Sequence, residues 1–429
     1  MKRYALLCAL FYSSIFAHYQ PTDANLAARQ SFQEARFGLF IHWGIYSQVA
    51  YGEWVMENQR MSLEKYEQFA PLFNPVKFDP TEWVSIAKAA GMKYITITAK
   101  HHDGFAMFGT QQNKWNIVDG TPYGKDVLKM LADECHKQGI KLFFYYSQLD
   151  WHHPDYFPRG RTGTATGRPS AGNWPDYIKF MNAQLTELLT NYGDIAGIWF
   201  DGWWDKPDAN WDLSTTFDLI HTLQPHALIG SNHHNTPFEG QDFQMFEQDL
   251  PGEANREFEK DTKISELPLE SCVTIQKYSW GINLLDRYDA TRSTKELIAD
   301  LVGAAGRNTN LLLNVGPLSD GTFPRDAIER LKEMGQWLDK YGESIYHTNG
   351  GPLSPRSWGV TTQRDNKIYV HLLKWKSNDA LWLPLQNVTQ GYYLNHDASL
   401  SYEISNNGIL LNHIEVHNPY DTVIVLEIE

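Results

Sequence analysis

Two acidic residues of the chain stand at the ends of apolar runs. Asp201 follows the run Ile195–Phe200, and Glu247 closes the run that begins at Asp242. Hydrolysis of a glycosidic bond usually requires two carboxyl groups, one that attacks or activates water and one that donates a proton to the leaving oxygen. A carboxylate in this position can instead cap a helix N-terminus, and Glu270 competes with Glu247 for the role of the acid. The pattern favours glycoside hydrolysis by Asp201 together with one of these acids.

Imidazole, indole and phenol side chains follow apolar runs elsewhere in the chain. They occur in His42-Trp43, Glu53-Trp54, His101-His102-Asp103, Tyr145-Tyr146-Ser147 and Asn232-His233-His234. A zinc ion needs three or more ligands around one point, whereas neighbouring residues of a strand point to opposite sides. A sugar with several hydroxyl groups needs the same donors and acceptors. We therefore expect a carbohydrate site with no metal and no cofactor.

The runs that carry these residues alternate with amphipathic segments, the order expected of βα units around a parallel sheet. Strands are predicted at Phe37–His42, Tyr94–Ala99, Lys141–Ser147, Ala196–Asp201, Ala227–Ser231, Asp242–Glu247, Val273–Ile275 and Asn310–Asn314. Helices are predicted at Pro80–Ala90, Lys125–Gln138, Trp174–Tyr192, Thr294–Gly306 and Arg325–Tyr341. This α/β pattern fits a (β/α)₈-like TIM barrel, in which active-site residues lie at the carboxyl ends of the strands. Loop insertions at 154–173 and 252–267 are expected to shape the leaving-group side.

The character of the chain changes after about Tyr346. Gly350-Gly351-Pro352 and Pro355 interrupt it, and short alternating strands follow, as at Lys367–Leu373, Leu381–Leu385 and Thr422–Ile428. This change predicts a catalytic barrel over residues 18–347 and a small C-terminal antiparallel β-sandwich over residues 348–429.

The N-terminus predicts export. Lys2 and Arg3 precede a largely apolar run that ends at Phe16, and the small residue Ala17 follows. This is the pattern of a cleavable secretory signal, here residues 1–17. The run is too short to span a membrane, and no other run approaches the roughly 20 apolar residues that spanning needs. We expect cleavage near Ala17 and a secreted or periplasmic protein.

Composition limits the partners of the chain. The formal net charge is −14, which disfavours nucleic acid because binding to phosphates needs a cationic surface. The aromatic content of 14%, with 15 tryptophans, suits stacking on sugar rings as well as it suits a large core. Once Cys8 is removed with the signal, only Cys135 and Cys272 remain, so no disulfide framework supports the fold.

Together these motifs resemble glycoside hydrolase family 29, the retaining α-L-fucosidases. The resemblance covers nearly the whole mature chain and is carried by Phe37–Gly44, Glu53-Trp54, Ala99–Phe105, Tyr145–Ser147, Trp199–Gly202, Trp280-Gly281 and Asn310–Pro317. It implies exo-acting hydrolysis of terminal α-L-fucose from glycans or glycoconjugates with retained configuration. Two alternatives are a non-catalytic fucose-binding lectin on the same fold and a metal-dependent barrel hydrolase.

The resemblance also implies roles for individual residues. Asp201 matches the nucleophile, Glu247 best matches the acid/base of some members, and Glu270 matches a second position considered for that role. The residues that resemble those holding fucose hydroxyls are His42, Glu53, Trp54, His101, His102 and Tyr146, and Trp280 resembles the aromatic residue packed against the C6 methyl. Some members carry an arginine near the fifth strand. This chain has Asn232-His233-His234 there, and His233 is its substrate-binding candidate.

Overall fold

The computed structural model describes residues 19–233, 235–253 and 263–429. The predicted signal peptide, residues 1–17, lies outside the described residues, and so does most of the predicted loop insertion 252–267. In the ranges that the structure describes, no helix is long and apolar enough to cross a membrane.

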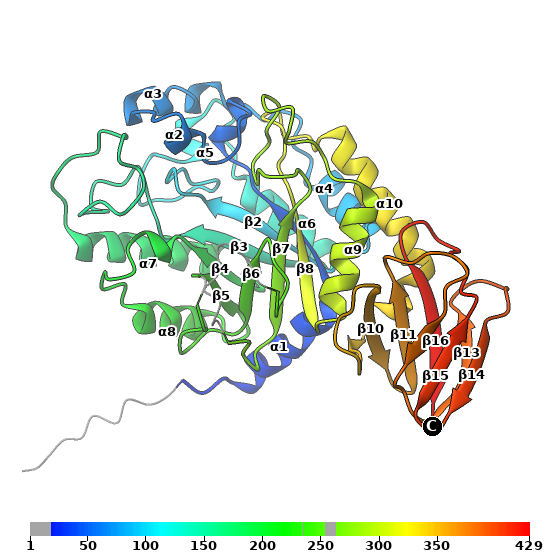
Figure 1. Ribbon diagram of the computed structural model, residues 1–429. Coiled ribbons are helices and arrows are strands. Elements are labelled where there is room, and N and C mark those ends of the chain that lie inside the picture. Colours follow the sequence, from blue (N-terminus) through cyan, green and yellow to red (C-terminus); the bar gives the residue numbers. More distant parts are fainter. Residues whose placement is uncertain (1–18, 234, 254–262) are drawn as a thin grey trace, which may run out of the picture.

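Eight parallel strands form the larger part of the molecule (Figure 1). They are β1 Phe37–Ile41, β2 Tyr94–Lys100, β3 Lys141–Ser147, β4 Gly197–Asp201, β5 Leu228–Asn232, β6 Gln244–Glu247, β7 Leu269–Thr274 and β8 Thr309–Val315. Their order, β5-β4-β3-β2-β1-β8-β7-β6, curls the sheet into a nearly closed barrel. Most strand residues are buried on both sides, because helices cover the outer face of a parallel sheet. The predicted (β/α)₈-like barrel is therefore confirmed.

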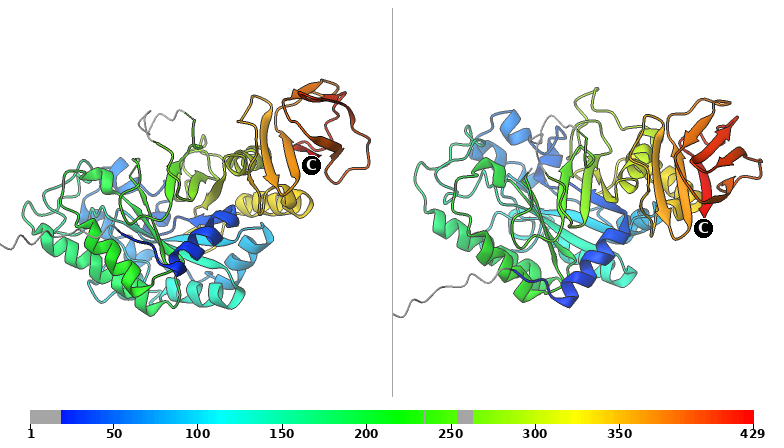
Figure 2. Two further views of the ribbon diagram at one scale, coloured as in Figure 1. Left: turned by 90° about the horizontal axis from the view of Figure 1, so that it is seen from below. Right: turned by 60° about the horizontal axis from the view of Figure 1, so that its bottom comes forward.

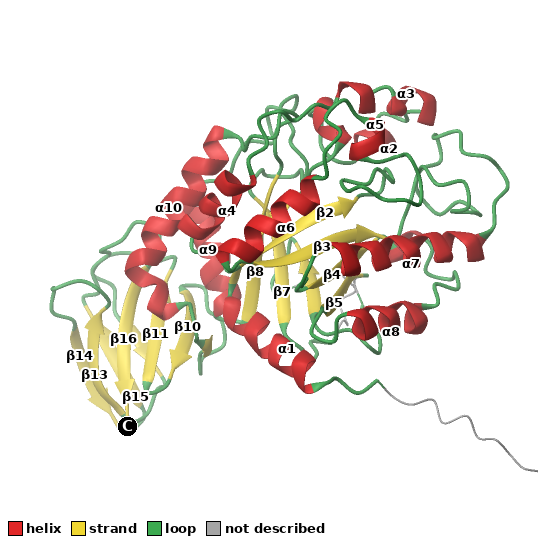
Figure 3. Ribbon diagram, turned by 180° about the vertical axis from the view of Figure 1, so that it is seen from behind, coloured by secondary structure: helices red, strands yellow, loops and turns green. Residues whose placement is uncertain are grey.

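Helices connect the strands and cover the outside of the barrel (Figures 1 and 3). The longer ones are α4 Pro80–Ala89, α6 Val127–Gln138, α7 Trp174–Asn191, α8 Leu213–Leu223, α9 Thr294–Ala305 and α10 Arg325–Tyr341. Short helical turns are η1 Ile45–Gln48, α2 Val55–Asn58, α3 Leu63–Glu67, η2 Ala70–Leu72, α5 Ile117–Gly120, η3 Trp203–Asp205 and η4 Gly342–Ser344. The turns α2, α3 and α5 lie at the end of the barrel where the strands finish.

The helix α1 Asp23–Ala35 lies across the opposite end of the barrel. Its Phe32 plugs that end, since the ring packs against Tyr94 at 5.3 Å, Phe143 at 5.4 Å and Phe243 at 4.8 Å between centroids. The barrel interior above this plug is filled by buried side chains. Active sites of such barrels lie at the other end, where the strands finish.

The barrel is not closed by a hydrogen-bond ladder on every side. In the part of the chain that the structure describes, β5 and β6 share no strand pairing, and we call this join the open seam. Near the α1 end of the seam, the Asp242 N–H donates to Ile229 O at 2.7 Å, and the Asp242 carboxylate accepts from the Ile229 N–H at 2.7 Å. Arg29 and His221 also bond this carboxylate. One main-chain bond and the contacts of the Asp242 side chain therefore stand in place of a continuous ladder at this end of the open seam.

The C-terminal part is a β-sandwich beside α9 and α10 (Figures 1 and 2). Its strands are β9 Asn349–Gly350, β10 Gly359–Arg364, β11 Lys367–Leu372, β12 Leu381–Leu383, β13 Val388–Tyr393, β14 Ser401–Ser405, β15 Gly408–Asn412 and β16 Thr422–Ile428. One sheet has the order β13-β16-β11-β10-β9 and the other β12-β15-β14, both antiparallel. Val360, Tyr369 and Val425 of the larger sheet belong to the same apolar cluster as the barrel helices. The barrel core therefore continues into the sandwich.

The sequence patterns predict the eight barrel strands and the helices α4, α6, α7, α9 and α10 to within about two residues, with one clear exception. The strand β7 begins at Leu269 rather than at the predicted Val273, because Glu270 is held inside the barrel by Tyr94 and Trp199. The patterns do not predict α1 or α8. The boundary between residues 347 and 348 stays a prediction.

Candidate active site

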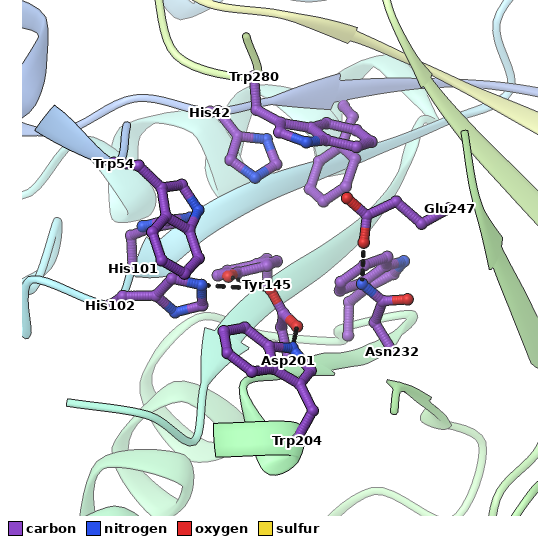
Figure 4. Close-up of a pocket in the computed structure, with 12 residues that line it drawn as sticks. His42, Trp54, His101, His102, Tyr145, Asp201, Trp204, Asn232, Glu247 and Trp280 are labelled. Atoms are coloured by element: carbon purple, nitrogen blue, oxygen red, sulfur yellow. Dashed lines mark hydrogen bonds and ion pairs between the residues drawn. The ribbon is translucent and has the colours of Figure 1, made fainter. Parts of the chain in front are cut away.

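A pocket of about 350 Å³ opens where the barrel strands end (Figure 4). Its walls combine carboxyl, imidazole, amide and aromatic groups. These belong to Phe40, His42, Trp54, His101, His102, Tyr145, Trp199, Asp201, Trp204, Asn232, Glu247 and Trp280. A concave site with a few convergent polar groups is the usual form of a small-molecule site, and the strands hold these groups in fixed positions.

Asp201 is the last residue of β4, and its carboxylate points into the pocket. Its Oδ2 accepts from the Tyr145 hydroxyl at 2.8 Å, and its Oδ1 accepts from Trp204 Nε1 at 3.0 Å and from the Gly202 N–H at 2.7 Å. Burial raises the pKa of Asp201 to about 6, and the charge of Glu247 adds to the rise while the three hydrogen bonds oppose it. The side chain is thus ionised at neutral pH and held in one orientation, as an attacking carboxylate needs.

Glu247 is the last residue of β6 and faces Asp201 across the pocket (Figure 4). Its Oε2 accepts a hydrogen bond from Asn232 Nδ2 at 2.6 Å. Asn232 ends β5 and is the ladder partner of Asp201. The last residues of three strands therefore bring two carboxyl groups and one amide to a single cavity. Two carboxyl groups on opposite sides of a pocket are the arrangement that cleaves a glycosidic bond.

Histidine rings line the pocket in their neutral form. Burial lowers the pKa of His42 to about 3, and it lowers the pKa values of His101 and His102 well below the ordinary value. His42 Nδ1 bonds Asn314 Oδ1 at 2.7 Å, and His102 Nδ1 bonds Ser147 Oγ at 2.7 Å. A neutral imidazole can donate through one nitrogen and accept through the other. These rings therefore suit an uncharged ligand rich in hydroxyl groups.

Phe40 and Trp280 form an aromatic wall that adjoins these rings, since His42 lies 4.4 Å from Phe40 and 5.2 Å from Trp280 between centroids. The Trp280 ring lies 5.8 Å from the Phe40 ring, between centroids. Glu53 anchors the Trp280 loop, since its Oε2 accepts from the N–H of Trp280 at 3.0 Å and of Gly281 at 2.7 Å. Asn314 Nδ2 donates to the Trp280 carbonyl at 2.7 Å. Glu53 is predicted to contact substrate, but the structure places its carboxylate on the backbone of this loop.

The α-L-fucosidase family model matches residues 8–343 of this chain. The chain belongs to the α-L-fucosidase family. It is therefore a glycosidase, and the resemblance to glycoside hydrolase family 29 is confirmed. Plasma α-L-fucosidase of Homo sapiens is 29% identical to it over 92% of this chain and 88% of that protein.

Solved α-L-fucosidase structures share the whole fold. Isoenzyme 1 from Paenibacillus thiaminolyticus superimposes with a TM-score of 0.81 at 34% identity and covers 95% of this chain and 100% of its own. The α-L-fucosidase from Vibrio sp. strain EJY3 gives a TM-score of 0.83 at 27% identity, covering 95% of this chain and 73% of its own. The likeness extends over the barrel and the sandwich together.

Besides Glu53, two more residues predicted to bind substrate, Tyr146 and His233, do not line the pocket. The Tyr146 hydroxyl donates to Gln184 Oε1 of α7 at 2.7 Å, on the outside of the barrel. Its neighbour Tyr145 faces the pocket instead. The ring of His233 packs against Phe238, with 4.1 Å between centroids.

His233 Nε2 bonds Gln241 Oε1 at 3.2 Å, which turns this ring away from the cavity. The preceding residue, Asn232, lines the pocket in its place. His233 follows the last residue of β5, where the chain leaves the sheet, so its ring does not enter the pocket with Asn232.

Glu270 lies deeper in the barrel than the pocket. Its Oε2 accepts from the Tyr94 hydroxyl at 2.6 Å, and its Oε1 accepts from Trp199 Nε1 at 2.8 Å. The residue is 1% exposed, and burial raises its pKa to about 7. Glu247 pairs in the ladder with Cys272, two residues further along β7 than Glu270. Glu270 thus supports the indole of Trp199, which lines the pocket, and does not reach the pocket itself.

The pocket residues that the sequence analysis does not select are Phe40, Tyr145, Trp199, Trp204 and Asn232. A signal for Tyr145 exists, because Trp199 and Asp201 share one face of β4 and their ladder partners in β3 are Tyr145 and Ser147. Asn232 falls one residue beyond the predicted end of its strand. Trp204 reaches Asp201 only through the turn after β4, which no periodicity reveals.

Metal ligation finds no support in the described part of the chain. Among residues 19–233, 235–253 and 263–429, no group of three histidine, cysteine, aspartate or glutamate side chains is placed to hold a metal ion.

Proposed function

We propose that this chain is an exo-acting α-L-fucosidase that removes terminal α-L-fucose from glycans or glycoconjugates with retention of configuration. The observation that carries the proposal is the pair Asp201 and Glu247, which face one another across a pocket lined by neutral imidazoles and by an aromatic wall (Figure 4).

The proposed reaction is a double displacement. The Asp201 carboxylate attacks the anomeric carbon while Glu247 gives its proton to the glycosidic oxygen, so that the carbon–oxygen bond breaks and the aglycone leaves as an alcohol. A water molecule then gives a proton to Glu247 as its oxygen attacks the same carbon, and the ester bond to Asp201 breaks. The two inversions restore the original configuration.

The pocket supports a terminal 6-deoxy sugar as the substrate. Neutral His42, His101 and His102 offer donors and acceptors to ring hydroxyls. Trp280 and Phe40 offer an apolar surface, where the C6 methyl of fucose would avoid the cost of burying a hydroxyl without a partner. The barrel interior below the pocket is packed with side chains, so a sugar enters end-on, as exo action requires.

The decisive experiment replaces the proposed nucleophile. Asp201→Ala should lower kcat on an aryl α-L-fucoside by about 10⁴-fold or more, because the covalent step is lost. Azide should restore part of the rate and give a fucosyl azide of inverted configuration, detected by proton NMR. Asp194→Ala, at an exposed position just before β4, is the matched control and should keep full activity. Normal turnover of Asp201→Ala would refute the proposal, and the absence of turnover by the unmodified protein would favour a lectin.

We also propose that residues 1–17 direct export to the periplasm or the exterior. Expression in a bacterial host followed by N-terminal sequencing should show a mature chain that begins near His18. A chain that keeps Met1 in the secreted fraction would contradict this proposal.

A further inference from the structure

We infer that Asn232 is a positioning residue for Glu247. Its amide group rotates by about 180°, so that it can hydrogen-bond either the carboxylate or the protonated form of this acid. The inference rests on the proposed function, in which Glu247 is the acid/base.

Only one of the two polar atoms of the Asn232 amide has a hydrogen-bond partner among the described residues. Its Nδ2 donates to Glu247 Oε2 at 2.6 Å, while its Oδ1 is buried and has no hydrogen-bond partner among the described residues. The residue is 3% exposed and lines the pocket. A buried acceptor without a partner carries a free-energy cost. Such an atom in a pocket wall points to a partner that is present at only one stage of the reaction.

The reaction supplies that partner. Glu247 as a carboxylate is an acceptor and needs a donor, which Nδ2 provides. Before the substrate binds, Glu247 as an acid carries an O–H and needs an acceptor, which Oδ1 provides after the amide turns by about 180°. When the glycosidic oxygen replaces Oδ1 as the acceptor of this proton, the amide turns back and Nδ2 donates to the carboxylate that forms. The two ends of an amide have nearly the same shape, so the turn preserves the packing. A cation at this position would favour only the carboxylate, and an anion would favour only the acid. Asn232 supports both states without a charge.

The position of Asn232 gives the contact a second consequence. Asn232 ends β5 and Glu247 ends β6, so the hydrogen bond crosses the open seam, where the ladder is missing. Asn232 is also the ladder partner of Asp201. The amide therefore fixes Glu247 relative to the nucleophile, which proton donation in step with attack requires.

The first test compares leaving groups. Asn232→Leu keeps the approximate shape of the side chain and removes both polar atoms. We expect kcat/KM to fall at least about tenfold more on a fucoside with a poor leaving group than on an aryl fucoside with a good one, the effect of losing one hydrogen bond to a charged group. Asn191→Leu, at the exposed end of α7, is the control and should change neither rate. An equal loss on both substrates would show that Asn232 binds the sugar and would overturn the inference.

The second test uses the pH profile and an isosteric variant that keeps the packing. Asn232→Asp places a carboxylate 2.6 Å from Glu247, and two like charges at that distance raise the pKa for loss of the shared proton. The alkaline limb of kcat/KM, which reports the acid in the free enzyme, should move up by about one pH unit. A limb that stays in place would overturn the inference, and this variant also serves if Asn232→Leu does not fold.

A double-mutant cycle separates this inference from the proposed function. Glu247→Ala alone should lose far more rate on the poor leaving group, and an equal loss on both would refute the acid/base assignment itself. In the Glu247→Ala background, Asn232→Leu should change the rate by less than about twofold, because the group it positions is gone. If the fold-losses of the two single variants instead multiply in the double variant, Glu247 stays the acid/base but the inferred role of Asn232 is overturned.

Discussion

Tyr145 and Tyr146 are identical neighbours in β3 with opposite surroundings. The Tyr145 hydroxyl donates to the Asp201 carboxylate inside the barrel, and the Tyr146 hydroxyl donates to Gln184 outside it. The bond from Tyr145 stabilises the ionised form of Asp201 and so opposes the rise that burial causes in its pKa. The pair therefore provides a matched comparison of the two faces of one strand.

The first prediction concerns the acid limb of the pH profile. Asp201 has a pKa raised to about 6, and attack needs its ionised form, so activity should fall as the pH falls through this value. Tyr145→Phe removes a donor to the carboxylate, which raises the pKa further. The acid limb of kcat/KM should move to higher pH by about half a unit to one unit. Tyr146→Phe should leave the limb where it is, and a shift in that variant alone would contradict the placement of the two rings.

Glu270 tests whether an acid buried below the pocket takes part in proton transfer. Its carboxylate accepts from both Tyr94 and Trp199, and an amide in its place would direct a donor at one of them. Glu270→Gln should therefore lower the free energy of unfolding by about 1–3 kcal/mol, measured by urea denaturation. The ratio of kcat/KM on substrates with good and poor leaving groups should be the same for Glu270→Gln as for the unmodified protein. Glu247→Gln should lower the rate on the substrate with the poor leaving group by about 10²–10⁴-fold. An equally large and selective loss in Glu270→Gln would show that Glu270 is the acid.

The strands and helices of the barrel could be predicted from the sequence where the local pattern of apolar residues matches the burial that the fold imposes. The strand β3 has its predicted bounds, Lys141–Ser147, because a continuous apolar run is what a strand buried on both faces needs. The start of β7 could not be read, since a glutamate inside a strand is acceptable only with partners that arrive from distant parts of the chain. The prediction that β5 ends at Ser231 was one residue short for a similar reason. Asparagine is disfavoured in strands, and the hydrogen bond from Asn232 to Glu247 cannot be read from local sequence.

The loop that carries Trp280 depends on close backbone packing after β8. A Cβ on Gly316 would meet the backbone nitrogen of Ile282 and would lie 2.7 Å from the carbonyl carbon of Gly281. These are backbone atoms, so the loop would have to move and take Trp280 with it. Gly316→Ala should lower kcat/KM on an aryl fucoside by about tenfold to a hundredfold, because small displacements in a site are costly.

A second glycine gives the control for this change. Gly342 follows α10 with a right-handed backbone, and a Cβ there would come no closer than 3.3 Å to Tyr346. Gly342→Ala should keep the activity of the unmodified protein. Equal activity of both variants would show that the packing around Gly316 does not hold the aromatic wall.

At the scale of the whole molecule, the barrel and the sandwich share apolar core. Val360 and Tyr369 pack into the cluster that contains the barrel helices, and the Thr362 hydroxyl donates to Ser344 O at 2.6 Å in the turn η4 after α10. A second cluster, around Val370 and Leu411, lies within the sandwich. The predicted division at residues 347 and 348 therefore cuts through buried contacts.

This shared core predicts cooperative unfolding. Differential scanning calorimetry of the full chain should show a single transition, because neither part can lose its contacts without exposing apolar surface of the other. A chain that ends at residue 347 should unfold at lower temperature or aggregate, since it exposes the surface that the larger sheet covers. Two well-separated transitions in the full chain would show that the parts are energetically independent.

The open seam connects the two strands that carry Asn232 and Glu247 with a remote part of the barrel. Retaining enzymes hold their carboxyl groups about 5 Å apart, and a wider gap admits the water that leads to inversion. The other neighbouring pairs of strands are joined by ladders of main-chain bonds, whereas β5 and β6 are held by one main-chain bond and by the side chains of Asp242 and Asn232. Asp242 holds them at the α1 end, where it is fully buried between Arg29, His221 and Ile229. In the proposed mechanism, a residue at the opposite end of the barrel from the sugar therefore helps to hold the two strands that carry Asn232 and Glu247.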